Sequence, residues 1–310
     1  MNNRLHGSVG AATAMFLVGT LAAGSSVIND YPLYGGQVLR YALSATILFA
    51  VARAKGLGLV RLTPRQALLL LSLAATGLVL FNVCVIQATR HASPTLVGTI
   101  VGTVPVVLAL VGPLLVRSRP SWRVLVAAAV VVVGATVTSG LGGGSLTGLL
   151  YAVGALACEA CFSLLAIPLL PRLGPVRVSA YTQAIAVPVL LIVGVVTDGS
   201  GLLRMPTAPE AAALLYLATV VSAGAFLLWY DALPRLGADR AGLFAGVLPV
   251  GAIVTTVLLG LGTPTASELG GAALVIAGLA IGLAPSRPLT PAGLPNRVWP
   301  RLPRWERLPP

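Results

Sequence analysis

The chain has 310 residues, of which 57% are hydrophobic and only 9% are charged, and its mean hydropathy is +0.95. Soluble globular domains carry roughly 25% charged residues, because their surface must be hydrated. This composition therefore excludes a soluble domain and the soluble enzyme classes. It predicts an all-α integral membrane protein.

The formal net charge is +12, but the arginines are scattered between apolar runs. A nucleic-acid-binding module needs a basic face, so we expect no nucleic-acid partner. The three cysteines, Cys84, Cys158 and Cys161, lie inside apolar runs, and the Cys-x-x-Cys pair at 158 and 161 has no histidine or further cysteine near it. This pattern predicts neither a disulfide framework nor a metal site, and we expect no cofactor.

A helix needs about 20 apolar residues to cross roughly 30 Å of hydrocarbon. Runs of this kind predict ten transmembrane helices, several of them joined by short connections. The predicted ranges are 8–28, 33–52, 66–88, 93–116, 124–140, 147–170, 178–197, 211–230, 241–260 and 269–284.

The positive charges predict the orientation of these helices. If the N-terminus is inside, the outer loops hold only Arg90 and Arg204, Arg40 lies within a helix, and every other Lys and Arg lies inside. The positive-inside rule then predicts that both termini are cytoplasmic, in a plasma-membrane protein. The segment 285–310 is rich in Pro and Arg and is predicted to be a disordered cytoplasmic tail.

The two halves of the chain align at an offset of 144 residues. The pattern Gly-x3-Gly-x2-Pro recurs, since Gly98, Gly102 and Pro105 match Gly242, Gly246 and Pro249. We therefore predict two five-helix repeats, 1–140 and 147–284. Five is odd, so the repeats must be inverted, and the arginine-rich segment 117–123 indeed matches 261–268, which has no arginine. Inverted repeats are typical of secondary transporters.

Two interpretations of the repeated glycines and prolines stay open. Glycines four residues apart let helices approach closely, and a mid-helix proline favours a kink. The pattern thus predicts either static helix packing or a hinge.

Three segments resemble the EamA-type transporters of the drug/metabolite transporter superfamily. They are PLYGGQVLRYALSA (32–45), QATRHASPTLVGTIVGTVPVV (87–107) and YDALPRLGADRAGLFAGVLPV (230–250), and the resemblance extends over about residues 8–284. It implies a cavity lined by helices one to four and six to nine. It places helices five and ten at the periphery, where a homodimer contact could form.

Arg40 and Glu159 are the charged residues that lie well inside predicted helices, and such residues are candidates for function. In one interpretation, Glu159 carries a proton in exchange for substrate and Arg40 anchors a substrate carboxylate or pairs with Glu159. The alternative is a permanent structural ion pair, or an arginine that extends to the interface. Further polar candidates are Asn82, Gln87, Tyr151 and Gln183, although amides within helices often serve packing. We assign Trp229 and Tyr230 to the interfacial aromatic belt.

The sequence therefore predicts a secondary active transporter that exports a small metabolite or an amino acid by alternating access, with the lipid bilayer as its other partner. Two alternatives remain, namely a structural membrane protein and a membrane-embedded enzyme. The enzyme is the weaker alternative, because the predicted helices hold a single carboxylate and no histidine.

Overall fold

The computed structural model describes residues 2–20, 28, 30–139, 144–258, 260 and 263–284, which are helical apart from their connections. The predicted tail 285–310 lies outside the described residues. The helices are α1 (Asn2–Gly19), α3 (Leu33–Ala54), α4 (Pro64–Ala74), η1 (Ala75–Leu80), α5 (Phe81–His91), α6 (Pro94–Val101), α7 (Val104–Leu115), α8 (Trp122–Ser139), α9 (Leu146–Leu164), α10 (Leu170–Asp198), η2 (Gly199–Gly201), α11 (Ala208–Tyr216), η3 (Leu217–Ala225), α12 (Phe226–Leu236), α13 (Ala238–Leu243), η4 (Phe244–Val247), α14 (Leu248–Leu258) and α15 (Ala266–Leu283).

The protein is an all-α membrane protein. Over the described residues, these helices join into ten helical segments, of which eight are long and apolar enough to cross a membrane. The other two are α8, whose apolar part Trp122–Val137 is shorter, and α1, which begins with the polar residues Asn2, Asn3 and Arg4. Eight of the ten predicted transmembrane helices therefore correspond to helices that are long and apolar enough to span a bilayer.

The two halves begin corresponding helices with the same cap. At α4, the backbone N–H of Gln66 donates to Thr63 Oγ1 at 3.3 Å, and the Thr63 N–H donates to Gln66 Oε1 at 3.1 Å. At α11, 144 residues later, the Thr207 N–H donates to Glu210 Oε2 at 2.8 Å. Such capping boxes satisfy free N–H groups at a helix start. The cap therefore places each helix start independently of the apolar pattern.

Pro105 and Pro249 lie directly after interruptions of their helical segments. A turn at Gly102 and Thr103 separates α6 from α7, and the 3₁₀ segment η4 separates α13 from α14. Proline has no N–H to donate to the preceding turn, so a helix restarts readily at this residue. Both segments are thus interrupted near their middle.

Two helical segments contain a π-helical stretch, η1 between α4 and α5 and η3 between α11 and α12. Each carries a threonine that bonds back to its own helix: Thr76 Oγ1 donates to the Ser72 carbonyl and Thr219 Oγ1 to the Leu215 carbonyl, each at 2.7 Å. Stretches of this kind are rare and occur often at functional sites. They displace the following turn relative to a regular helix.

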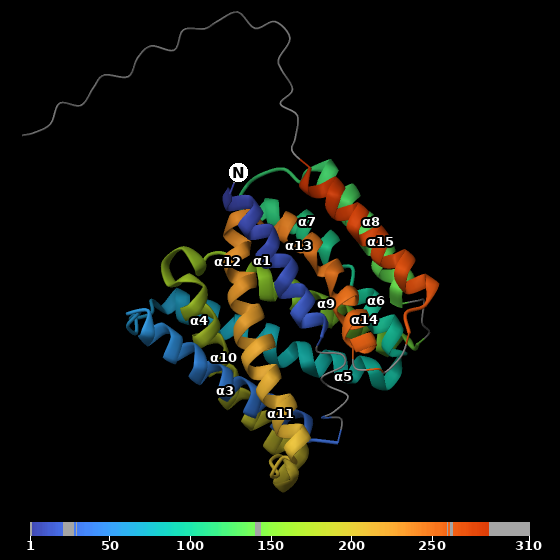
Figure 1. Cartoon of the computed structure of the whole chain (residues 1–310). Coiled ribbons are helices and arrows are strands. Elements are labelled where there is room, and N and C mark those ends of the chain that lie inside the picture. The colour runs from blue at the N-terminus through green and yellow to red at the C-terminus, as the bar shows by residue number, and fades with distance from the viewer. Residues whose placement is uncertain are drawn as a thin grey trace, which may run out of the picture.

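The helices pack in pairs that join the two halves. α8 lies along α15 at one edge of the bundle, and α3 packs against α10 on the opposite side (Figure 1). Between these pairs, α1 packs against α12 and α9 packs against α5. One large core cluster connects α1, α3, α4, α9, α10 and α12.

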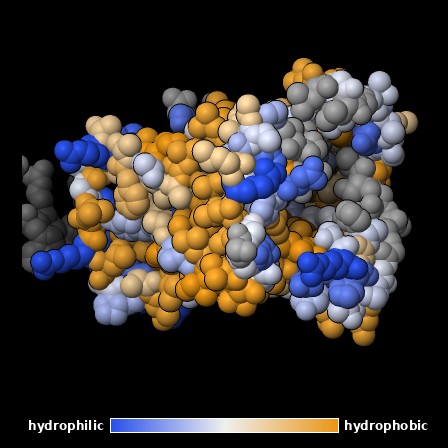
Figure 2. Space-filling view, turned by 90° about the horizontal axis from the view of Figure 1, so that it is seen from below, coloured by the Kyte–Doolittle hydropathy of each residue, from blue (hydrophilic) through white to orange (hydrophobic). Residues whose placement is uncertain are grey.

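Large apolar side chains are exposed on the outer surface, for example Ile192, Val196 and Leu150. Figure 2 shows apolar side chains covering the middle of one face, with hydrophilic ones gathered toward its two ends. An apolar surface of this width is unfavourable in water and favourable in the hydrocarbon of a bilayer. This distribution fits a bilayer around the middle of the bundle.

Candidate functional site

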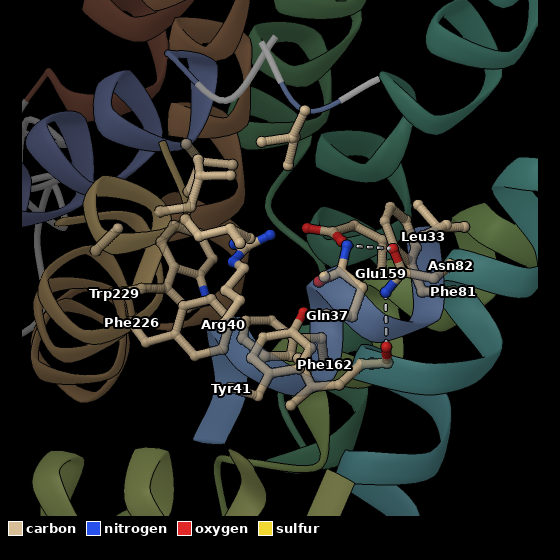
Figure 3. Close-up of a pocket in the computed structure, with 18 of the residues that line it drawn as sticks. Leu33, Gln37, Arg40, Tyr41, Phe81, Asn82, Glu159, Phe162, Phe226 and Trp229 are labelled. Carbon is tan, nitrogen blue, oxygen red and sulfur yellow. Dashed lines mark hydrogen bonds between the residues drawn. The ribbon is translucent and has the colours of Figure 1, made fainter. Parts of the chain in front are cut away.

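A cavity of about 290 Å³ lies between helices of both halves. It extends from the chain just before α3 to aromatic side chains of α9 and α12, and both π-helical segments contribute to its wall (Figure 3). Its polar or charged lining residues are Tyr31, Gln37, Arg40, Tyr41, Asn82, Glu159 and Trp229. The remaining lining is mainly aliphatic and aromatic, which is typical of a small-molecule site.

Arg40 is held in a fixed position on α3. It is buried, its Nε donates to Ser222 Oγ of η3 at 2.5 Å, and its guanidinium carbon lies 5.3 Å from the centroid of the Tyr41 ring. Its two Nη groups have no hydrogen-bond partner among the described residues, and they point into the cavity in Figure 3. A guanidinium with two free donors can bind a carboxylate or phosphate.

Glu159 reaches the same cavity from α9, on the other half of the chain. Its side chain is half-buried. The ion pairs between described residues are Arg204–Glu210 and Arg235–Asp231, so Arg40 and Glu159 do not lie within 4.0 Å of each other in this conformation. The cavity therefore holds one guanidinium group and one carboxyl group, and both are available to a bound molecule.

Two amides form a polar patch next to Glu159. Asn82 Nδ2 donates to the Leu78 carbonyl at 2.6 Å, and Gln37 Nε2 contacts Asn82 Oδ1 at 3.5 Å, while Gln37 Oε1 has no partner among the described residues. The sequence analysis missed Gln37. Its position one helical turn before Arg40 could have indicated it, because residues three apart share a helix face.

Aromatic side chains lie at one end of the cavity, opposite the chain that precedes α3. The rings of Phe162 and Phe226 have centroids 4.9 Å apart, and those of Phe162 and Tyr230 are 5.2 Å apart. Trp229 Nε1 donates to Ser163 Oγ at 3.3 Å. Trp229 and Tyr230 are 3% and 0% exposed, so their assignment to an interfacial belt was wrong. The polar end of each ring finds its partner inside the protein.

The model of the EamA-like transporter family matches residues 6–140 and 146–283. The chain belongs to the EamA-like transporter family. It is thus a membrane transporter of the drug/metabolite transporter superfamily, and it is not an enzyme.

This EamA-like chain resembles one curated protein and one solved structure in particular. It is 26% identical over 254 residues to the protein named "Uncharacterized transporter YetK" of Bacillus subtilis (strain 168). The matched region covers 79% of this chain and 77% of that protein. A solved crystal structure matches with a TM-score of 0.79 and 21% identity, covering 91% of this chain and 98% of the other. The structural match shows a shared fold.

Three polar residues named from the sequence of this EamA-like transporter lie outside the cavity lining. Gln183 is fully buried behind Arg40, where its Nε2 donates to the Ser222 carbonyl at 2.9 Å. Tyr151 packs against the small cluster of Ala88, Ala92, Val97 and Ala152. Gln87 is half-buried on α5 and does not contribute to the cavity. Gln183 therefore touches the site only through Ser222.

The repeated glycines of the EamA-like chain have different surroundings. A Cβ built at Gly242 would lie 2.9 Å from Leu108 Cβ, and one at Gly246 would crowd Val131 and Val275. A Cβ at Gly102 would meet the carbonyl oxygen of Gly98 at 2.9 Å. A Cβ at Gly98 itself would meet no described atom within 4 Å. Close helix packing is thus found around Gly242 and Gly246 and is absent at Gly98 in this conformation.

Polar contacts of Arg204 connect the loop before α11 to Tyr31 at the cavity. Arg204 pairs with the buried carboxylate of Glu210, and its guanidinium carbon lies 4.8 Å from the Tyr31 ring centroid. The Tyr31 hydroxyl donates to the Arg204 carbonyl at 2.7 Å. The hydrogen bonds that Arg204 donates to the Glu210 carboxylate raise the pKa of Arg204. This contact joins the starts of α3 and α11, and Tyr31 itself lines the cavity.

Proposed function

We propose that the protein is a secondary active transporter that exports a small metabolite or an amino acid by alternating access, with Glu159 carrying the coupled proton. The observation that supports this most is the cavity that Arg40 and Glu159 share, because they come from opposite halves of the chain. Arg40 would bind a substrate carboxylate through its free Nη groups. Glu159 would bind a proton on one side of the membrane and release it on the other.

Two inverted repeats, residues 1–140 and 147–284, are part of this proposal. The packing supports them: α1 contacts α12 as α9 contacts α5, and α3 contacts η3 as α10 contacts η1. Each of these pairs maps onto its counterpart at the offset of 144 residues. The π-helical stretches η1 and η3 lie at matching places as well. Rocking of one repeat against the other would then alternate access to a site between them.

We place both termini in the cytoplasm, so the cavity mouth near Tyr31 opens outward. The aromatic residues Phe162, Phe226 and Tyr230 then form the inner barrier. In the opposite state these rings would separate and the mouth would close. The interruptions before Pro105 and Pro249 are our proposed hinges for this change. We further propose a homodimer contact along α8 and α15, which form one edge of the bundle (Figure 1).

A flux experiment tests the transport proposal. Purified protein in liposomes is presented with amino acids, nucleosides and cationic drugs, with and without a pH gradient. We expect a carboxylate-bearing solute to be transported and its flux to increase with the gradient. Transport of cationic drugs alone would contradict the role of Arg40, and flux that is indifferent to the gradient would contradict proton coupling.

A pair of cysteine substitutions tests the inverted topology. Arg119 and Thr263 are exposed and occupy equivalent places at the 144-residue offset. We expect a membrane-impermeant maleimide to label Arg119→Cys only from the cytoplasmic side and Thr263→Cys only from the outside. The native cysteines give little background, since Cys84 and Cys158 are buried and Cys161 is half-buried. Labelling of both variants from one side would rule out inversion.

A further inference from the structure

A second pocket, of about 410 Å³, lies apart from the transport cavity. It is enclosed by the end of α3, the loop that follows it and the first part of α10 after the Gly174 kink. Of its lining residues, we use Phe49, Arg53, Leu59, Arg177 and Tyr181 below. No residue of this pocket contributes to the cavity that contains Arg40 and Glu159.

The wall of this pocket is built by specific contacts. The Val60 N–H donates to the Tyr181 hydroxyl at 3.2 Å, and Arg177 Nε donates to the Gly58 carbonyl at 3.1 Å. The Phe49 and Tyr181 rings lie 5.9 Å apart. The loop is therefore tied to α10 at two points, and the pocket has a defined shape.

The charge of the pocket is uniformly positive. Arg53 and Arg177 line it, and no Asp or Glu is among its lining residues. The guanidinium of Arg53 and the Nη groups of Arg177 have no protein hydrogen-bond partner among the described residues, since the Nε of Arg177 makes the bond to Gly58. Guanidinium groups with free donors bind phosphate oxygens well.

The remainder of the pocket is apolar and lies at the membrane surface. Leu59 is 82% exposed at its edge, in a loop that also carries the apolar residues Leu57, Val60 and Leu62. Since α3 is a membrane-spanning candidate that ends at Ala54, the pocket lies where a span leaves the bilayer. An exposed leucine beside two arginines suits a molecule with an acyl chain and an anionic headgroup.

We propose that this pocket binds the phosphate of an anionic phospholipid, with Arg53 and Arg177 on the phosphate and Leu59 beside the acyl region. Phosphatidylglycerol is the probe that we choose, because it is anionic at the phosphate alone. The proposal does not depend on the transported substrate or on proton coupling.

Lipid binding to the purified full-length protein tests the proposal. The dissociation constant for phosphatidylglycerol is measured by native mass spectrometry, with phosphatidylcholine as the neutral lipid. We expect phosphatidylglycerol to bind more tightly than phosphatidylcholine. We expect Arg53→Gln to weaken it about fivefold, and Arg53→Gln with Arg177→Gln by about the square of that factor, since each basic residue near a lipid surface contributes about 1 kcal/mol.

The control is Arg65→Gln with Arg119→Gln, which removes the same charge from exposed positions outside the pocket. Equal weakening by the control would overturn the proposal, because net charge alone would then explain the binding. Equal binding of phosphatidylcholine would overturn it too. Displacement of the lipid by equimolar glycerol phosphate would assign the pocket to a soluble anion instead. If the double variant does not fold, Arg53→Gln alone decides, because Arg53 is exposed and its loss breaks no hydrogen bond.

Discussion

Glu159→Gln is expected to abolish proton-driven transport while the protein still folds. Glutamine has nearly the volume of glutamate but cannot exchange a proton. The Glu159 carboxylate accepts no hydrogen bond and forms no ion pair with the described residues, so the amide breaks no existing interaction. Flux driven by a pH gradient in liposomes should fall to the background of empty liposomes, and the pH dependence should disappear.

A second assay measures substrate exchange across the membrane without a pH gradient. It distinguishes the loss of proton coupling from the loss of substrate binding. If Glu159 only couples, the Glu159→Gln variant should retain exchange of labelled for unlabelled substrate. Asp198→Asn is the matched control, because Asp198 is an exposed carboxylate at the end of α10, away from the cavity. It should leave both activities unchanged. Wild-type flux and pH dependence in Glu159→Gln would refute the assignment of the proton to this residue.

Residue chemistry and segment length made much of this structure predictable. Long apolar runs separated by arginines indicated the helical segments, because hydrocarbon requires about 20 apolar residues per helix. The cost of charge in a bilayer singled out Arg40 and Glu159, and both line the same cavity. The offset of 144 residues aligned not only the glycines and prolines but also the helix caps at Thr63 and Thr207.

The faces of the helices could not be predicted in the same way. A helix that is apolar on all sides does not reveal which side meets lipid and which side meets protein. Trp229 and Tyr230 therefore looked interfacial although both are buried, and Trp229 lines the cavity. Gln183 was named from its residue type alone and Gln37 was not named, whereas the π-helical stretch η3 decides that Ser222 stands between Gln183 and Arg40. Such π-helical stretches depend on tertiary packing. The adjacent Thr76 and Gly77 in η1 are only a weak sequence signal for that stretch.

Gly251→Ala is expected to destabilise the protein, although alanine favours a helix over glycine by about 1 kcal/mol. Gly251 of α14 and Gly19 of α1 meet where these helices cross. A Cβ built at Gly251 would collide with the Phe16 carbonyl oxygen and would lie 3.2 Å from Gly19 Cα. Since backbone atoms cannot move aside as a flexible side chain can, we expect an overpacking cost of about 1–3 kcal/mol to exceed the helix-propensity gain. The midpoint of thermal unfolding should fall.

Gly270→Ala gives the matched control for this substitution. Gly270 is also helical, but a Cβ there meets no described atom within 4 Å. The same change should therefore leave the unfolding temperature unchanged or raise it. If both variants lower the temperature equally, the collision at Gly251 is not the cause.

The same crossing connects stability with transport, because Leu248 lines the cavity and its carbonyl faces Gly19. A Cβ at Gly19 would collide with that carbonyl, so Gly19→Ala should separate α1 from α14 in the same way as Gly251→Ala. Helices that are already separated accommodate the second methyl group at little further cost. The double variant should thus lose less stability than the sum of the single variants, because substitutions at residues in contact do not act independently. Strict additivity would mean that the two glycines are not the point of contact between α1 and α14.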